Sequence, residues 1–205
     1  MVSDPHREPL PQRSTVDDSE VTAHALAAGR GTPGAVEEFV RSTYRDLWRF
    51  LAYLSDVQSA DDLTQETYLR AWTALPRFTG RSSARTWLLA IARRVVVDRY
   101  RAASSRPRTT EVADWADLVE RRQDKGVPGF DEGVALTDLC RTLPPQRREA
   151  FVLTQVIGLD YAATAQILGC PIGTVRSRVA RARDDLALLL RAAEQIGDRP
   201  TARST

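Results

Sequence analysis

The sequence has few of the residues on which metal sites, disulfide scaffolds and histidine-based catalysis depend: two histidines and two cysteines in 205 residues. His6 and His24 lie near the N-terminus, far along the chain from any plausible nucleophile, which argues against Ser-His or Cys-His catalysis. Cys140 and Cys170 have neither the close spacing nor the histidine partners of a zinc site, and two cysteines are too few for a disulfide framework. We therefore expect two buried thiols, no metal, no cofactor and no catalytic residue.

Long apolar runs and glycine-rich phosphate loops are also missing. Charged residues interrupt the hydrophobic ones every few positions, so no stretch approaches the roughly 18 to 20 apolar residues that cross a bilayer. Residues 1–21 mix three prolines with both signs of charge and lack the apolar centre of a secretory signal. We expect a cytoplasmic protein without membrane insertion, and an enzyme is disfavoured.

The formal net charge of +2 conceals an uneven distribution. Residues 76–101 hold seven arginines against one acid, and residues 171–183 hold four arginines and no acid. Residues 55–69 hold four acids and no base. Two basic stretches and one acidic stretch predict two nucleic-acid contacts and a separate surface for another partner.

Apolar residues recur at helical spacing along most of the chain, and strand-like alternation is not sustained anywhere. We expect Ser59 or a neighbour to cap the second helix, Pro76 to end it, and Ser82 or Ser83 to cap the third. The fold class predicted is all-α, with two small helical domains joined by a flexible linker and a helix-turn-helix in the C-terminal one. The predicted helices span about 34–54, 60–75, 83–101, 132–142, 145–157, 161–168 and 172–191.

The domain limits are predicted from where this periodicity stops. Ser, Thr, Pro and Gly interrupt it between the two helical regions, which is typical of a linker, although a short helix at 115–122 is an alternative there. The predicted parts are a disordered tail 1–30, a first domain 31–101, a flexible linker 102–131, a second domain 132–192 and a disordered tail 193–205.

Residues 161–183 have the internal logic of a helix-turn-helix. Ala162 and Ala165 are small where two helices approach, and Gly169 permits the positive backbone angle of the turn. Val175 and Val179 then face the core, which leaves an arginine-rich face for the major groove. A solvated amphipathic helix pair is the alternative, and the single sign of charge disfavours it. The candidate DNA contacts here are Pro171, Gly173, Thr174, Arg176, Ser177, Arg178 and Arg181.

Two separated blocks resemble the extracytoplasmic-function group (group 4) of the sigma-70 family. Residues 61–72, DDLTQETYLRAW, and residues 78–101 resemble region 2, and residues 143–183 resemble region 4. The resemblance implies an alternative sigma factor that binds core RNA polymerase and directs promoter-specific initiation. It also implies that region 2 reads the minus-ten element and region 4 the minus-thirty-five element.

The resemblance implies contacts for the acidic stretch as well. Asp62, Gln65, Glu66 and Leu69 fall at i, i+3, i+4 and i+7, on one helix face. By resemblance this face docks on the clamp coiled coil of the beta-prime subunit, while the beta flap and an anti-sigma factor are further candidate partners. The candidate polymerase contacts are Asp61, Asp62, Leu63, Gln65, Glu66 and Leu69.

For the first basic stretch, promoter opening needs arginines for phosphates and a pocket for an unstacked base. By resemblance the loop between the second and third helices captures that base. Trp87 is able to stack on a base, although its Leu-Leu-Ala-Ile context favours a core role. The candidate minus-ten contacts are Arg77, Thr79, Gly80, Arg81, Ser82, Ser83, Arg85, Arg93 and Arg94.

Three other interpretations remain open from the sequence. A conventional helix-turn-helix transcriptional regulator would share the C-terminal motif. A response regulator is disfavoured because the first hundred residues show no βα alternation. A metal site at Asp61 and Asp62 is disfavoured because helix-surface carboxylates without a histidine or a second acidic cluster seldom bind metal.

Overall fold

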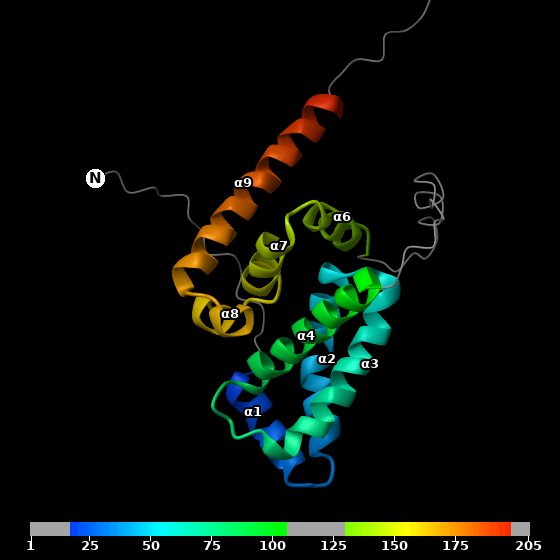
Figure 1. Cartoon of the computed structure of the whole chain (residues 1–205), viewed down its shortest axis with the longest axis vertical. Coiled ribbons are helices and arrows are strands. Elements are labelled where there is room, and N and C mark those ends of the chain that lie inside the picture. The colour runs from blue at the N-terminus through cyan, green and yellow to red at the C-terminus, as the bar shows by residue number, and fades with distance from the viewer. Residues whose placement is uncertain (1–16, 106–129, 198–205) are drawn as a thin grey trace, which may run out of the picture.

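The computed structural model describes residues 17–105 and 130–197, and within those ranges every regular element is helical (Figure 1). The predicted all-α class is confirmed for this part of the chain. None of the described helices is both long and apolar enough to cross a membrane. The elements are α1 (Asp18–Gly29), α2 (Ala35–Leu54), α3 (Val57–Ala74), η1 (Leu75–Arg77), α4 (Ala84–Ser105), α6 (Phe130–Arg141), α7 (Pro145–Phe151), η2 (Val152–Val156), α8 (Tyr161–Leu168) and α9 (Ile172–Gly197).

The first domain is formed by the helices α1, α2, α3 and α4. Large apolar side chains of α2 and α4 meet in its core. Leu47, Phe50 and Leu51 on α2 are each fully buried, as are Leu88 and Leu89 on α4. Phe50 and Leu51 lie three and four residues after Leu47, which places the three on one stripe of α2, as the sequence predicts. Each buried side chain of this size contributes about 1.5–3 kcal/mol by leaving water.

Helix α1 is an unpredicted element, because residues 1–30 were expected to be a disordered tail. That expectation is wrong for Asp18–Gly29, whose first turn is capped by the Asp17 carboxylate accepting from the Ser19 N–H at 3.0 Å. Val21, Ala25 and Ala28 bury one side of α1. Two of these three are alanines, so the helix contributes little to a hydrophobicity pattern. Residues 1–16 lie outside the described residues.

The caps of the next two helices were predicted with mixed success. Asp56, and not Ser59, caps α3, because its carboxylate accepts from the Ser59 N–H at 2.7 Å. Ser83 caps α4 as predicted, since its hydroxyl accepts from the Thr86 N–H at 3.2 Å. The start of α4 therefore follows directly from the residues of the preceding loop.

The second domain comprises α6 to α9, with the predicted helix-turn-helix in α8 and α9. Asp160 caps α8 through the Ala163 N–H at 2.6 Å, and Gly169 makes the turn with φ of +63°. Val175 and Val179 are both fully buried, as their spacing predicts. Helix α9 continues to Gly197, so the expected tail at 193–205 is wrong for 193–197, and 198–205 lie outside the described residues.

The two domains lie against each other: α8 contacts α4, and α6 and η2 contact α2 (Figure 1). Helix α4 runs to Ser105 and α6 begins at Phe130, which shortens the predicted linker at both ends. The short helix considered at 115–122 falls outside the described residues.

Candidate nucleic-acid and partner interfaces

The acidic side of α3 presents a mixed polar and apolar surface. Asp62, Gln65 and Glu66 are exposed, and Leu69 is 67% exposed on the same face. We call these four residues the α3 face. Trp72, one turn beyond Leu69, is 53% exposed. Two large apolar side chains left in water beside carboxylates are typical of a surface that another macromolecule covers.

The two predicted polymerase contacts that are not part of the α3 face, Asp61 and Leu63, make contacts within the first domain. Asp61 is exposed but accepts a hydrogen bond from the Trp48 indole N–H at 2.8 Å. Leu63 is 3% exposed and packs in the core, so its prediction as a direct contact is corrected: its place on the helix turns it toward α2 and α4. Trp72 was missed, although its i+3 spacing from Leu69 is the signal that places it beside the α3 face.

Arg70 lies next to the α3 face and joins two carboxylates. Its guanidinium donates to Asp98 at 2.6 Å and to Glu66 at 2.8 Å. These hydrogen bonds, that to Asp98 first, raise the pKa of Arg70. Because the three side chains are exposed, the pairs contribute little to stability and leave the Glu66 carboxylate accessible.

The predicted base-reading loop, residues 78–83, connects η1 to α4. Thr79 and Arg81 are exposed, and Ser82 is half-buried. Gly80 adopts φ of +72°, a backbone conformation that strains any residue with a Cβ. The loop thus combines exposed polar side chains with a turn whose backbone conformation requires glycine at position 80.

Trp87 packs against Phe78 at the start of this loop. The two ring centroids are 4.8 Å apart with the planes tilted by 38°. Trp87 is half-buried and lies against the core of the first domain, as its apolar context predicted. Its ring therefore supports the loop from inside.

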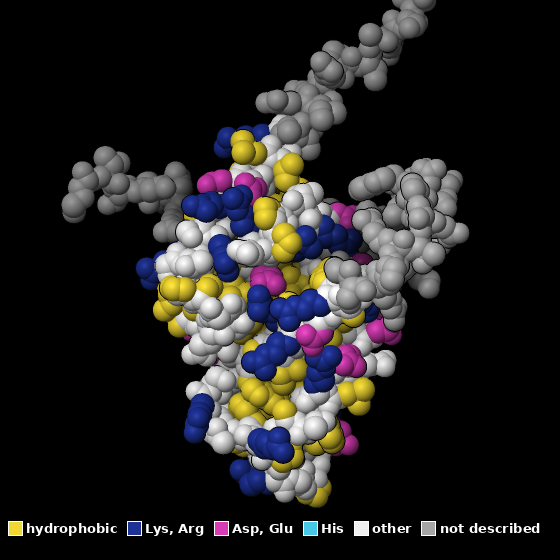
Figure 2. Space-filling view, viewed as in Figure 1, with side chains coloured by type: hydrophobic (Ala, Val, Ile, Leu, Met, Phe, Trp, Pro, Cys, Tyr) yellow, Lys and Arg dark blue, Asp and Glu magenta, His cyan; other side chains and the backbone are white. Residues whose placement is uncertain are grey.

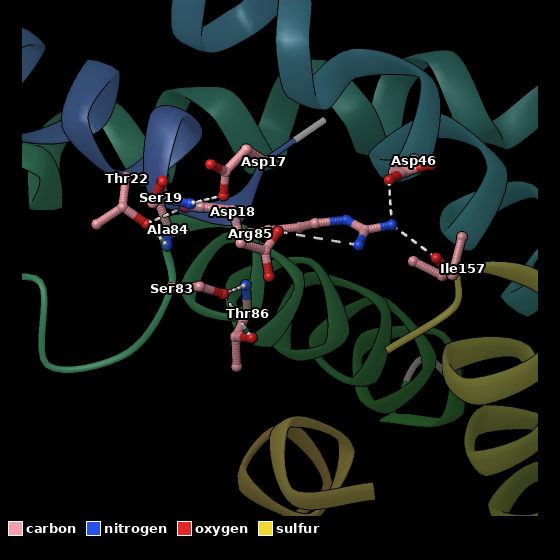
Figure 3. Close-up of polar contacts among 10 residues, drawn as sticks. All are labelled: Asp17, Asp18, Ser19, Thr22, Asp46, Ser83, Ala84, Arg85, Thr86 and Ile157. Atoms are coloured by element: carbon pink, nitrogen blue, oxygen red, sulfur yellow. Dashed lines mark hydrogen bonds and ion pairs between the residues drawn. The ribbon is translucent and has the colours of Figure 1, made fainter. Parts of the chain in front are cut away.

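Arg85, predicted to contact phosphate, is instead held between both domains. Its side chain is 14% exposed and pairs with the Asp46 carboxylate on α2. It also donates to the carbonyl oxygen of Ile157 in the second domain at 2.6 Å and lies 3.9 Å from Asp18 on α1 (Figure 3). The guanidinium is thereby surrounded by acceptors and is not on the open surface.

Arg93 is engaged in the same way further along α4. Its guanidinium lies 3.0 Å from the Glu149 carboxylate on α7, which is only 12% exposed. A third contact between the domains is made by Arg141, whose guanidinium donates a hydrogen bond to the Ser55 carbonyl oxygen at 3.2 Å. These pairings are not predictable from local sequence patterns, because each joins residues that are tens of positions apart.

The remaining predicted minus-ten arginines are on the surface, and the junction between the domains is incompletely filled. Arg77, Arg81 and Arg94 are exposed. Figure 2 shows basic side chains across the middle of one face, over the junction between the domains. A cavity of about 660 Å³ lies at this junction, lined by Leu54, Val96, Val97, Tyr100, Arg101, Pro145, Arg148 and Glu149.

On α9 the arginines of the helix-turn-helix differ in their surroundings. Arg176 is exposed and lies 5.9 Å above the ring of Tyr161. Arg181 is exposed. Arg178 is half-buried and donates to the Gln146 side chain at 2.9 Å. Arg181 lies on the side of α9 away from the buried valines, whereas Arg176 and Arg178 flank them on either side, and an arginine in any of these positions is able to reach a DNA groove.

The non-basic residues predicted for this surface cluster at the start of α9. Pro171 and Gly173 are exposed and Thr174 is half-buried. The Ser177 hydroxyl donates to the Thr174 carbonyl oxygen at 3.0 Å. The first turn of α9 is thus open to solvent, as a helix end that meets DNA requires.

The thiols and acids do not form a metal site in the described residues, where no group of three suitable ligands was found. Cys140 is fully buried, and burial raises the pKa of its thiol to about 11. Cys170 is only half-buried, so the expectation that both thiols are buried is wrong for it. Its sulfur lies at the turn of the helix-turn-helix, 3.6 Å from the Arg178 guanidinium.

Comparison with known families and proteins identifies two matching segments. A family model described as sigma-70 region 2 matches residues 39–106, and one described as sigma-70 region 4 matches residues 134–186. The chain is 56% identical over 170 residues to the ECF RNA polymerase sigma factor SigC of Mycobacterium tuberculosis, covering 83% of this chain and 91% of that one. It is 32% identical over 190 residues to the ECF RNA polymerase sigma factor BldN of Streptomyces coelicolor, covering 90% and 70%.

Two solved structures are similar in fold. CnrH in complex with the cytosolic domain of CnrY matches with a TM-score of 0.66 at 24% identity, over 84% of this chain and 98% of that one. The sigma factor RpoE from Bartonella quintana, in complex with the anti-sigma factor NepR, matches with a TM-score of 0.59 at 26% identity, over 80% and 98%. Helix α1 lies outside both matched family segments.

Proposed function

This chain belongs to the sigma-70 family and is an alternative sigma factor that directs transcription initiation, and from that premise we propose which of its surfaces perform each task. The first domain binds core RNA polymerase and reads the minus-ten element. The second domain reads the minus-thirty-five element. The chain acts by binding, and the polymerase supplies the catalysis.

The α3 face is the proposed docking surface for the beta-prime clamp coiled coil. The observation that carries this proposal is the 67% exposure of Leu69 beside the carboxylates of Asp62 and Glu66. An apolar side chain supplies affinity when it is covered, and the carboxylates around it set orientation and partner choice. Trp72 extends the same surface and is included in the proposal, whereas Leu63 is left out because it is buried.

Loop 78–83 and the arginines around it are the proposed minus-ten surface. Arg77, Arg81 and Arg94 are exposed and are free to meet phosphates of the displaced strand. Thr79 and Ser82 place hydroxyls in the loop beside the positive-φ Gly80, where a flipped base is to be read. Phosphate binding by Arg93 requires its pair with Glu149 to break, so the second domain must move away first.

The start of α9 is the proposed minus-thirty-five surface. Arg176, Arg178 and Arg181 supply guanidinium groups for guanine edges or phosphates, and Thr174 and Ser177 supply hydroxyls. Pro171 and Gly173 let the first turn approach the backbone of the duplex closely. Contact is expected to end at Asp184 and Asp185, because carboxylates repel phosphate; Asp185 already accepts from Arg147 at 2.6 Å.

The proposed partners are core RNA polymerase, including the beta flap, promoter DNA and an anti-sigma factor. The Bartonella quintana sigma factor with a similar fold is complexed with the anti-sigma factor NepR, which supports a partner of that class for this chain. We place these interactions in the cytoplasm, where the polymerase and the promoters are.

The test of the docking surface is co-migration with purified core polymerase in size-exclusion chromatography. The double substitution Asp62→Arg/Glu66→Arg is expected to abolish co-migration, and Arg176→Ala/Arg178→Ala to preserve it. Loss of binding in the second variant alone would overturn the proposed division of tasks. If the wild-type chain does not bind core polymerase but binds duplex DNA with good specificity, the result would indicate a conventional helix-turn-helix regulator.

A further inference from the structure

Helix α1 packs beneath both ends of the base-reading loop. At the loop's first end, Gly29 of α1 lies so close to η1 that a Cβ there would be 2.7 Å from the Leu75 carbonyl oxygen. Within the loop, the position of a Cβ on Gly80 is 3.6 Å from Leu26 and 3.9 Å from Thr22, both on α1. The course of the loop is therefore in contact with a helix that neither family segment includes.

At the other end of the loop, the hydroxyl of Thr22 joins α1 to the first residue of α4. It donates to the Asp18 carbonyl oxygen at 2.6 Å and accepts from the Ala84 N–H at 3.0 Å (Figure 3). Ala84 is fully buried, and the N–H groups in the first turn of a helix have no acceptor within their own helix. Thr22 thus supplies the acceptor that this buried donor needs.

The cap of α4 shows that this bond is a separate function from capping. Ser83 accepts from the Thr86 N–H at 3.2 Å, which satisfies a donor one turn further along. Ser83 belongs to the loop itself and moves with it. Thr22 belongs to a different helix, so its bond fixes where the last residue of the loop lies relative to α1.

We propose that Thr22 is a positioning residue for base recognition: by holding the Ala84 N–H against α1, it fixes the geometry in which loop 78–83 receives the flipped base of the minus-ten element. This rests on the proposed function of that loop. A pocket that reads a base by hydrogen bonds has to be held within a fraction of an ångström, by groups that are themselves locked in place. Without the Thr22 hydroxyl, the buried Ala84 N–H loses its partner and the end of the loop shifts to find another.

The experiment uses holoenzyme assembled from core polymerase and the full chain, with a promoter from which the wild type initiates. The probe is a fluorescent single strand carrying the nontemplate minus-ten element, alongside a set in which each base of the element is changed in turn. The readout is the selectivity, defined as the affinity for the correct strand divided by the affinity for each altered strand. A merely structural role for Thr22 lowers the melting temperature and leaves this ratio unchanged.

Thr22→Val removes the hydroxyl and keeps the shape, and we expect it to lower the selectivity at the captured base by on the order of tenfold. Binding to core polymerase and to minus-thirty-five duplex should stay at the wild-type level. Thr22→Ser retains the hydroxyl and should restore the selectivity. Thr154→Val is the matched control, because that threonine hydroxyl bonds only within its own helical segment in the second domain: it donates to carbonyl oxygens and accepts from the Gln155 side-chain amide at 3.0 Å.

The outcomes separate the positioning role of Thr22 from the proposed function of the loop. If Thr22→Val keeps the wild-type selectivity, or if Thr22→Ser loses it, the positioning role is overturned, and the second result decides the matter even if the valine variant folds poorly. If the wild-type holoenzyme itself shows no selectivity for the minus-ten strand, the proposed function of the loop fails, whatever the variants do.

Discussion

The guanidinium of Arg93 on α4 lies 3.0 Å from the carboxylate of Glu149 on α7, so a residue proposed to bind the promoter strand is paired with the other domain. We expect Glu149→Gln to free Arg93 and to tighten binding of the single-stranded minus-ten element. The gain should be roughly fivefold at most, because an ion pair of this kind contributes up to about 1 kcal/mol. Fluorescence anisotropy of the labelled strand at fixed salt measures it.

The control for this substitution is Glu38→Gln, which removes an exposed pair with Arg41 within α2. It makes the same chemical change in the first domain and should leave strand binding unchanged. Equal binding by wild type and Glu149→Gln would show that the Arg93–Glu149 pair does not limit access to the strand.

Leu69→Ala tests the apolar part of the α3 face. The side chain is 67% exposed, so its truncation should change the free energy of unfolding by less than about 0.5 kcal/mol. Affinity for core polymerase should fall by about thirtyfold or more, because truncating an anchor at the centre of an interface costs about 2 kcal/mol or more. Titration of labelled protein with core polymerase gives the affinity, and Tyr44→Ala, a truncation of another exposed large side chain on α2, is the control. Unchanged affinity would remove Leu69 from the interface.

Arg176→Ala tests the minus-thirty-five surface. Loss of a guanidinium that contacts a base edge should weaken specific duplex binding by about 1–3 kcal/mol, whereas loss of a phosphate contact should weaken all sequences alike and reduce the salt dependence. Arg191→Ala, an exposed arginine further along the same helix, is the control and should have no effect. Binding of the specific duplex measured at several salt concentrations separates these cases, and wild-type behaviour of Arg176→Ala would contradict the assignment.

Gly29→Ala tests the close packing of α1 on η1. Alanine favours a helix over glycine by about 1 kcal/mol, so a surface glycine would gain stability from this change. At Gly29 the new Cβ would meet the Leu75 carbonyl oxygen at 2.7 Å, and backbone must shift, so we expect a lower midpoint in urea unfolding. Gly173→Ala, where nothing lies within 4 Å, should be neutral or stabilising. A stabilised Gly29→Ala variant would mean that α1 does not pack as described.

The burial of Cys140 gives stability a dependence on alkaline pH. Burial raises the pKa of its thiol from 9.0 to about 11, so the folded chain keeps this proton after the unfolded chain has lost it. The free energy of unfolding should therefore fall as the pH rises from about 9 to 11, and Cys140→Ala should lessen this fall. Tyr68, whose pKa burial raises from 10.0 to about 12, contributes to both proteins alike. Urea unfolding under reducing conditions measures the difference, and identical slopes would contradict it.

The sequence was sufficient for whatever depends on local spacing. The helical stripes of Leu47, Phe50 and Leu51 and the buried pair Val175 and Val179 follow from periodicity alone. The cap at Ser83 follows from a serine placed between a glycine loop and an apolar run. These features need only near neighbours, so a single sequence contains all the information that they require.

Helix α1 and the partners of the arginines were not predictable in this way. The buried side of α1 consists mostly of alanines, which bury little area and leave no strong pattern. The burial of Leu63 among the exposed acids of α3 depends on how that helix is turned toward its neighbours. The pairing of Arg85 with Asp46 and the Ile157 carbonyl depends on the contact between the two domains, which no local pattern encodes.

The most direct test of the central claim is a run-off transcription assay in which core RNA polymerase is supplied with genomic promoter fragments, with and without the chain. We expect specific transcripts only when the chain is present. Asp62→Arg/Glu66→Arg should eliminate all of them, whereas Arg176→Ala/Arg178→Ala should eliminate only those that depend on a minus-thirty-five element. Transcripts that are the same without the chain, or that persist at full level in the first variant, would contradict the central claim.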